Sequence, residues 1–139
     1  MDRSLLDTST LSDVIAPTAK RRPAVTDHLQ RYLAEHGRLT FSQISCYEIL
    51  RGLRKKRAAA QIERFATFCK HSELVPVAYD VLDRAAQLWA DGRQRGITVD
   101  DSDLVIAATA LLEGLPLVTA NARHFAWIDG LTISNWRES

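Results

Sequence analysis

The sequence predicts a single α/β domain, a three-layer α/β/α sandwich built around a mainly parallel sheet. Short apolar runs of strand length alternate with longer helix patterns along the chain, which is typical of βαβ units. The segment 103–114 is apolar on all sides, so its helix is expected inside the molecule. With 139 residues, 46% of them hydrophobic, the chain is long enough to form one domain (1–139) with its own core.

Each element is predicted from its own local pattern. Gly37 is expected to end one helix, and the Ser42 hydroxyl to cap the start of the next. The expected strands are 3–7, 38–41, 73–80 (with a turn), 115–121 and, at the edge of the sheet, 131–136. The expected helices are 8–15, 26–37, 43–56, 58–71, 81–96, 103–114 and a short 123–128, with a loop or irregular helix start at 16–24. Two of these helices show apolar stripes, formed by Leu29, Tyr32 and Leu33 in one and by Val81, Leu82, Ala85, Leu88 and Trp89 in the other.

The charge and the cysteine content narrow the class of protein. The formal net charge is only +1, so no overall positive field marks a nucleic-acid-binding protein, and any polyanion has to be met by a local cluster. The two cysteines, Cys46 and Cys69, are expected to be reduced and buried. The sequence shows neither a signal-peptide pattern nor an apolar run of membrane length, so we expect a soluble cytoplasmic protein with no membrane partner.

Two acids stand in unusual surroundings, and each has a structural and a functional interpretation. Asp7 follows the first strand, so it either caps the next helix or points into the crevice at the carboxyl edge of the sheet. Glu48 lies in the apolar helix segment "ISCYEILRGL", where an unpaired carboxylate is strongly unfavourable. It requires a cation, either Arg51 one turn later or a metal ion. A pair at that spacing contributes only ~0.2–0.5 kcal/mol, so the functional interpretation is favoured.

Three aspartates, Asp100, Asp101 and Asp103, stand at the start of the apolar helix. Acids at a helix start satisfy free N–H groups and interact favourably with the helix dipole, but one acid suffices for this. Three acids repel one another, which indicates a nearby cation. Oxygen ligands without a His or Cys cluster select Mg²⁺ or Mn²⁺. We expect Asp103 to serve the site and Asp100 or Asp101 to cap the helix.

Four segments, "LLDTSTLSDVI", "ISCYEILRG", "DLVIAATALLEGLPLVTANARHF" and "GLTISNW", occur in the order and spacing of VapC-type toxins. Over essentially its whole length, the chain resembles these members of the PIN-domain ribonuclease family. The family's first acid falls on Asp7, its helical glutamate on Glu48, and its third acid on Asp103, three residues before "IAA". The fourth position, an aspartate in many members, is Asn121 here, and an acid often found before the phenylalanine is His124.

The resemblance implies a PIN-like fold and a Mg²⁺- or Mn²⁺-dependent endoribonuclease held inactive by a cognate VapB-type antitoxin. The carboxylates would hold a metal that activates a water for phosphodiester hydrolysis, with Asp103 or Glu48 positioning or deprotonating that water. Because Asn121 and His124 leave fewer acids, a one-metal site, or a second ion completed by RNA phosphate, is expected. Supporting roles around the site are assigned to Thr8, Ser9, Asp100, Thr119 and Asn121.

The resemblance also implies partners. The expected substrate is a structured RNA such as a tRNA or a ribosomal RNA loop, and its cleavage would inhibit translation and growth. Phosphate contacts are assigned to Arg21, Arg22, Arg51, Arg54, Lys55, Lys56 and Arg57. A charged, solvated helix face explains the same basic run equally well. A homodimer is expected, with a higher toxin–antitoxin assembly as a further option.

Three other functions stay open at this point. A phosphohydrolase of the haloacid-dehalogenase type requires a second aspartate two residues after the first, where this chain has Ser9. A receiver domain requires a late lysine at a strand end, and "PLVTAN" has none. A non-catalytic PIN-like domain that binds RNA or protein is distinguished by whether Asp7, Glu48 and Asp103 converge. Convergence of like charges is expected to raise the pKa of at least one of them.

Overall fold

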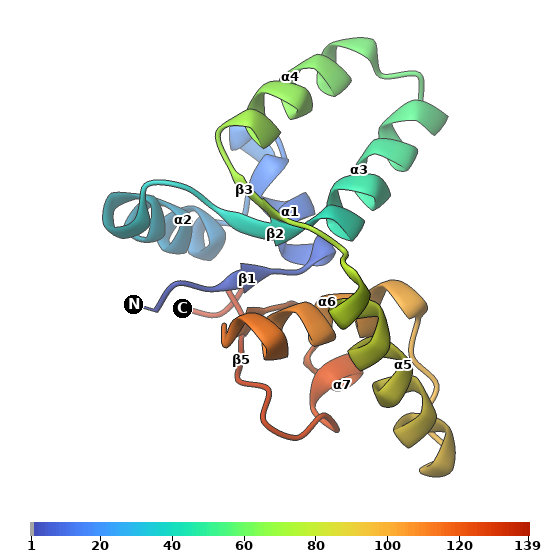
Figure 1. Cartoon of the computed structure of the whole chain (residues 1–139). Helices are drawn as coiled ribbons and strands as arrows, with labels where there is room; N and C mark the ends of the chain where they lie inside the picture. The colour runs from blue at the N-terminus through green and yellow to red at the C-terminus, as the bar shows by residue number, and fades with distance from the viewer. Residues whose placement is uncertain (1) are drawn as a thin grey trace.

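A computed structural model describes residues 2–139 and contains a five-stranded parallel sheet (Figure 1). The strands are β1 (Leu5–Leu6), β2 (Thr40–Ser42), β3 (Glu73–Val75), β4 (Leu117–Val118) and β5 (Ile133–Ser134). Their order across the sheet is β3-β2-β1-β4-β5, and every neighbouring pair is parallel. The predicted parallel sheet is confirmed, with β1 at its centre and β5 at an edge.

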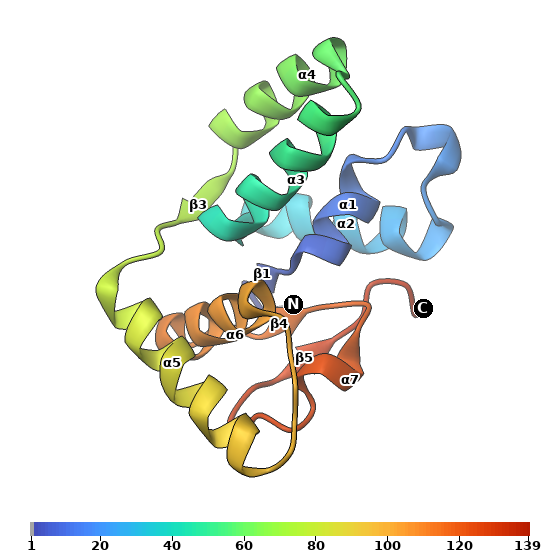
Figure 2. The same ribbon diagram turned by 90° about the vertical axis from the view of Figure 1, so that its right-hand side faces the viewer.

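Helices connect the strands and cover both faces of the sheet (Figures 1 and 2). They are α1 (Thr8–Ile15), α2 (Pro23–His36), α3 (Gln43–Lys55), α4 (Ala59–Lys70), α5 (Tyr79–Gln94), α6 (Asp101–Glu113) and α7 (Ala122–Phe125), with a 3₁₀ turn at Thr18–Lys20. Helices α3 and α4 form a hairpin that projects from one side of the sheet (Figure 1).

Two hydrophobic cores fill the spaces on the two faces of the sheet. Successive residues of a strand point to opposite faces, and accordingly Leu5 packs with α5, α6 and α7 whereas Leu6 packs with α1 to α4. Helix α6 lies in the first core, where Ile106 and Ala107 are fully buried, as its apolar sequence predicted. The three-layer architecture follows directly from these two cores.

The predicted helix-ending glycine and helix-capping serine are both confirmed. Gly37 ends α2 in the left-handed conformation, with φ of 79°. The Ser42 hydroxyl accepts a hydrogen bond from the Ile44 N–H at 3.1 Å and caps α3. Helix α2 begins earlier than predicted, at Pro23, because proline at the first helical position needs no hydrogen bond for its nitrogen.

Three large side chains of the predicted apolar stripes lie outside the hydrophobic cores. Leu33, Leu82 and Trp89 are 39%, 51% and 47% exposed. Helix α5 instead packs its core face on α6 through Val81, Ala85 and Leu88. Helical spacing alone does not show which apolar side of α5 packs on α6 and which adjacent side remains exposed.

The two cysteines lie on adjacent helices and are not bonded to each other. Cys46 and Cys69 are free, as expected, with their Sγ atoms 3.8 Å apart, but they are half-buried rather than fully buried. Burial and the neighbouring Cys46 raise the pKa of the Cys69 thiol to about 12, which keeps it protonated. Within residues 2–139, no helix has both the length and the apolar character required to cross a membrane.

Candidate active site

Asp7 stands where central strand β1 passes into α1, at the carboxyl edge of the sheet. Its side chain is almost fully buried and caps α1, because Oδ1 accepts the Thr10 N–H at 2.9 Å. The same oxygen accepts the Ser9 hydroxyl at 2.7 Å. The capping interpretation is therefore confirmed for Asp7. It does not exclude a role in a site, since these two donors occupy only Oδ1 and the carboxylate has a second oxygen, Oδ2.

Thr119 holds the other oxygen of Asp7 from the next strand. It follows β4, is fully buried, and donates its hydroxyl to Asp7 Oδ2 at 2.5 Å. The Thr119 Oγ1 also accepts the Asn121 N–H at 2.9 Å. Neighbouring parallel strands thus deliver Asp7 and Thr119 to one point, which is the usual position of a site in such sheets. Asn121 itself is exposed and contributes this backbone group.

Glu48 faces the same region from α3, which packs against both α1 and α6 (Figure 2). Its Oε1 accepts the Thr8 hydroxyl at 2.6 Å, and Thr8 Oγ1 lies 3.0 Å from Ser45 Oγ. Arg51, predicted as the structural partner, pairs with Oε2 at 3.5 Å while remaining 61% exposed. This long and exposed ion pair leaves most of the Glu48 charge to be balanced by other groups.

Asp103 lies in the first turn of α6 and is mostly buried. Its Oδ2 lies 3.0 Å from Nδ1 of His124, which comes from α7. Burial raises the pKa of the Asp103 carboxyl, the His124 contact lowers it, and the charges of Asp7 and Asp100 raise it; the net shift is upward. The expectation of one raised carboxyl pKa is confirmed, although burial contributes more than convergence. Asp100 occupies the cap position of α6 without a side-chain capping hydrogen bond.

The three predicted acids are linked in pairs. Asp7 and Asp103 lie close enough for their charges to interact, and Asp7 is joined to Glu48 through its chain neighbour Thr8. Their donor atoms are carboxylate and hydroxyl oxygens, which suit Mg²⁺ or Mn²⁺, and a cation would relieve the repulsion between the two aspartates. Across residues 2–139, no three His, Cys, Asp or Glu side chains are grouped tightly enough to hold one ion. The residues therefore fit a hard cation in the type of ligand atom and in charge. In this structure, Asp7 and Glu48 accept hydrogen bonds from neighbouring hydroxyl and N–H groups instead.

Two residues of this region were not predicted as site members. Ser45 is fully buried and lies against Thr8, and His124 contacts Asp103 across 21 residues of sequence. The sequence indicated His124 only as a departure from the acid that the family often has before the phenylalanine. No local pattern indicates that its ring faces the first turn of α6.

The predicted RNA-binding residues divide into two groups. Arg51, Arg54, Lys55, Lys56 and Arg57 are exposed along the end of α3 and the turn that follows it. Arg22 is also exposed, but Arg21 is half-buried and its Nε is buried without a hydrogen-bond partner in the described part of the chain. In the first group, four basic residues follow one another from Arg54 to Arg57, and all five come after Glu48 along α3 and the turn that follows it.

A groove with a volume of about 990 Å³ opens beside Glu48 and Thr8, between the α1–α2 segment and the α3–α4 hairpin. Its apolar lining includes Leu29, Leu39, Ile49, Leu53, Phe65 and Phe68. Its basic lining comprises Arg21, Arg38, Lys56, Arg64 and the ring of His71. No local pattern predicts this groove, because its walls come from segments far apart in the chain.

Three comparisons place the chain among known proteins. A sequence profile of the PIN domain matches residues 4–131. The chain is 32% identical over 142 residues to "Ribonuclease VapC2" of Haemophilus influenzae, covering 98% of this chain and 99% of the relative. It is 30% identical over 143 residues to "tRNA(fMet)-specific endonuclease VapC" of Salmonella typhimurium, again covering 98% and 99%. Its fold matches a DNA-bound VapBC structure from Salmonella typhimurium with a TM-score of 0.83, 26% identity, and coverage of 98% and 99%.

Proposed function

Because the chain belongs to the PIN-domain family, and within it to the VapC type, we propose that it is the ribonuclease toxin of a type II toxin–antitoxin pair. It would hydrolyse phosphodiester bonds of RNA with Mg²⁺ or Mn²⁺ and so inhibit growth. The observation that carries the proposal is the hydrogen bond of Thr119 to Asp7 at the carboxyl edge of the sheet, with Asp103 within range of the Asp7 charge and Glu48 joined to this edge through Thr8. A non-catalytic PIN-like domain would gain nothing from placing the acid Asp103 where burial and the neighbouring Asp7 both disfavour its charge.

The chain's own residues would orient the carboxylates. A divalent ion bound at this edge, with Asp7 and Asp103 as its carboxylates and Glu48 facing it from α3, would supply an activated water and stabilise charge on the phosphate. Three donors, Ser9, Thr10 and Thr119, fix the Asp7 carboxylate, so it cannot rotate away from the crevice. Thr8 fixes Oε1 of Glu48 in the same way. Such rigid placement lowers the reorganisation needed at the reacting phosphate.

RNA would be held by the exposed basic end of α3. The exposed side chains of Arg54, Lys55 and Arg57 can pair with RNA phosphates and release counterions. RNA binding should therefore weaken steeply with added salt. The Salmonella relative bears a name that specifies tRNA(fMet). We therefore propose a tRNA as the substrate class to be tested first.

The antitoxin would occupy the groove between the α1–α2 segment and the α3–α4 hairpin. The groove's apolar lining suits an amphipathic segment, and its basic residues, with Glu48 as the one acid among the lining side chains, call for acidic side chains on that segment. The buried Arg21 Nε provides a specific donor for one of those carboxylates. Since the groove reaches Thr8 and Glu48, a segment bound there would also cover the acids.

Cleavage is tested with a pair of variants in one helix turn. Asp103→Ala is expected to abolish both growth inhibition and new RNA 5′ ends after brief induction. Asp101→Ala, an exposed acid two residues earlier, is expected to retain both. Chelation by EDTA should mimic Asp103→Ala in purified protein. If Asp103→Ala still cleaves at the same positions, the proposed site is wrong. If neither wild type nor Asp101→Ala cleaves any cellular RNA, the non-catalytic alternative is favoured.

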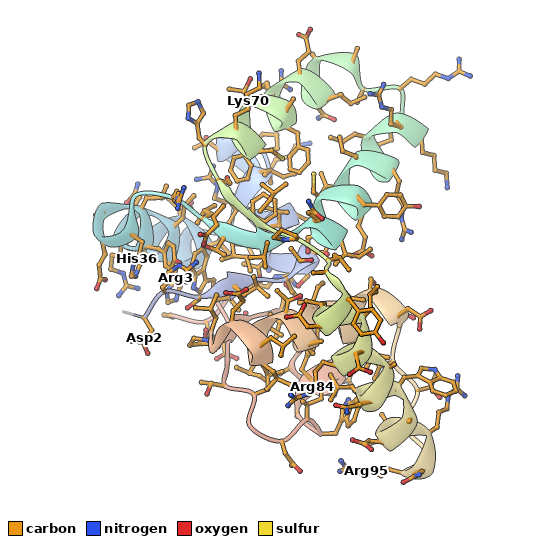
Figure 3. The ribbon with its side chains drawn as sticks, in the orientation of Figure 1. Asp2, Arg3, His36, Lys70, Arg84 and Arg95 are labelled. Atoms are coloured by element: carbon orange, nitrogen blue, oxygen red, sulfur yellow. The ribbon has the colours of Figure 1, made fainter. Side chains whose placement is uncertain are left out.

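The antitoxin site is tested by reversing charge at two positions of α4. Arg64→Glu, in the groove, is expected to weaken the purified toxin–antitoxin pair and to prevent the antitoxin from rescuing growth. Lys70→Glu, at the end of the same helix and outside the groove lining, is the matched control (Figure 3). Equal affinity of both variants for the antitoxin would refute this location without affecting the assignment of the acids.

A further inference from the structure

One exposed side of α3 carries an aromatic ring followed by basic side chains. Tyr47 is 55% exposed. The exposed basic residues that follow it on this side are Arg51, Arg54 and Lys55. The four residues are spaced by four, three and one positions, so they lie along one side of the helix. At a rise of about 1.5 Å per residue, they extend over about 12 Å. This surface, the Tyr47 stripe, begins one residue before Glu48.

Arg51 connects the ring to the candidate active site. Its guanidinium carbon lies 5.4 Å from the centre of the Tyr47 ring, and its Nη2 lies 3.5 Å from Oε2 of Glu48. A nucleotide held at Tyr47 would therefore lie beside one of the site acids. We propose that an unpaired base of the RNA substrate stacks on the Tyr47 ring. The basic side chains of the stripe would pair with the phosphates next to that base. This inference rests on the proposed ribonuclease function and adds the residue that selects an unpaired base.

The chemistry of the stripe matches that of a single-stranded RNA loop. Unpaired bases stack on tyrosine rings and on guanidinium planes, and nearby cations hold the backbone. The stripe offers a ring, a guanidinium group beside that ring, and two more cations farther along the helix. Bases inside an RNA helix are already stacked on one another and present no free face. The Tyr47 stripe therefore suits a loop better than a duplex.

A protein partner suits the stripe less well than RNA does. The residues that α3 contributes to the groove proposed for the antitoxin are Glu48, Ile49, Gly52, Leu53 and Lys56. In the described part of the chain, that lining includes no residue of the Tyr47 stripe. A second copy packed on the stripe would bring the arginines and the lysine of both copies together, and like charges across an interface oppose association. RNA supplies both a planar base and negative charge.

Helix α5 provides a matched control for the ring. Trp89 is 47% exposed, and the guanidinium carbon of Arg93 lies 4.9 Å from the centre of its ring. This pair has the same four-residue spacing as Tyr47 and Arg51. Helix α5, however, carries none of the three candidate acids. If position beside the site matters, Tyr47 should affect RNA binding and Trp89 should not.

RNA binding by a cleavage-deficient protein tests the stacking. Each variant is made in the full-length Asp103→Ala chain and assayed in EDTA, so that the RNA stays intact. The probes are stem-loop oligoribonucleotides that each carry the fluorescent base 2-aminopurine at one loop position. At one position, stacking on Tyr47 should quench the fluorescence. Tyr47→Ala should lose this quenching and bind that stem-loop about tenfold more weakly. Tyr47→Phe should keep both properties, and Trp89→Ala should bind like the Asp103→Ala parent.

Removing the base from the RNA provides the decisive comparison. An abasic ribose at the quenched position should weaken binding of the parent about tenfold. It should not weaken binding of Tyr47→Ala further, because both changes remove the same contact. Additive losses, or equal losses for Tyr47→Ala and Trp89→Ala, would overturn the stacking. A changed mass of Tyr47→Ala in solution would also overturn it and assign the ring to a contact between copies.

Failure of the stacking is distinguishable from failure of the proposed function. Cleavage of RNA by the native chain is measured separately, with Mg²⁺ or Mn²⁺ present. If the native chain cleaves RNA and Tyr47→Ala binds the stem-loops as well as its parent does, only the stacking is refuted. If the native chain cleaves no RNA and the parent binds no stem-loop, the ribonuclease assignment and the stacking are refuted together.

Discussion

Replacing Thr119 by valine removes a single hydroxyl from the centre of the candidate site with almost no change in shape. That hydroxyl donates to Asp7 Oδ2 at 2.5 Å and accepts the Asn121 N–H at 2.9 Å. A hydrogen bond to a charged group contributes about 1.5–3 kcal/mol, and a neutral one about 1 kcal/mol. Both Thr119 and Asp7 are buried, so water cannot replace the lost donor. We expect the free energy of unfolding to fall by about 2–4 kcal/mol.

Thr109→Val is the matched control, since Thr109 is also fully buried. Its hydroxyl donates at 2.7 Å to the Val105 carbonyl within α6, an acceptor that keeps its helical hydrogen bond. We expect this variant to lose less than about 1 kcal/mol. Urea denaturation with an unchanged slope against denaturant measures both values. Equal losses for the two variants would show that the Asp7–Thr119 hydrogen bond contributes no special stability.

Two further predictions concern the other acids of the site. Asp103→Asn should stabilise the protein near neutral pH, because burial raises the pKa of Asp103 and the folded state therefore holds its ionised form at a cost. The gain in stability of Asp103→Asn over the native protein should be present above the raised pKa and should disappear as the pH falls through that pKa. Thermal unfolding of both proteins across pH measures this gain. A gain that does not change with pH would contradict the prediction. Glu48→Gln keeps an acceptor for Thr8 and loses only the exposed pair with Arg51, so stability should change by less than about 0.5 kcal/mol while RNA cleavage is lost. Retained cleavage in this variant would remove Glu48 from the site.

Much of the fold could be predicted from local patterns, for reasons visible in particular elements. Helix α6 is apolar all round because it is enclosed by the sheet, α5 and α7, and β1 and β4 are short apolar runs because both of their faces are covered. Ser42 and Gly37 act on their immediate neighbours, so their roles are also local. The orientation of α5 could not be predicted in this way, because the side that meets α6 depends on the rest of the fold.

The candidate site was predictable only in part. Asp7 stands out from its position after a strand, and Glu48 from its apolar surroundings, but their assignment to one site rested on resemblance to a family. Ser45 and His124 were missed because their contacts join residues 37 and 21 positions apart. The residue pattern within one helix cannot predict contacts between residues on different helices, such as Thr8 with Ser45 or Asp103 with His124. The groove was missed for the same reason.

The two hydrophobic cores have a consequence for how the protein should lose activity on heating. Asp7 and Glu48 are carried by helices of one core, whereas Asp103 and His124 are carried by helices of the other. These halves are joined by strands of two or three residues and by the packing of α3 on α6. A small shift of one half against the other would separate the acids before either half melts. On heating, loss of activity should therefore precede the main unfolding transition. A ligand that contacts both halves should raise the temperature of inactivation toward that of unfolding.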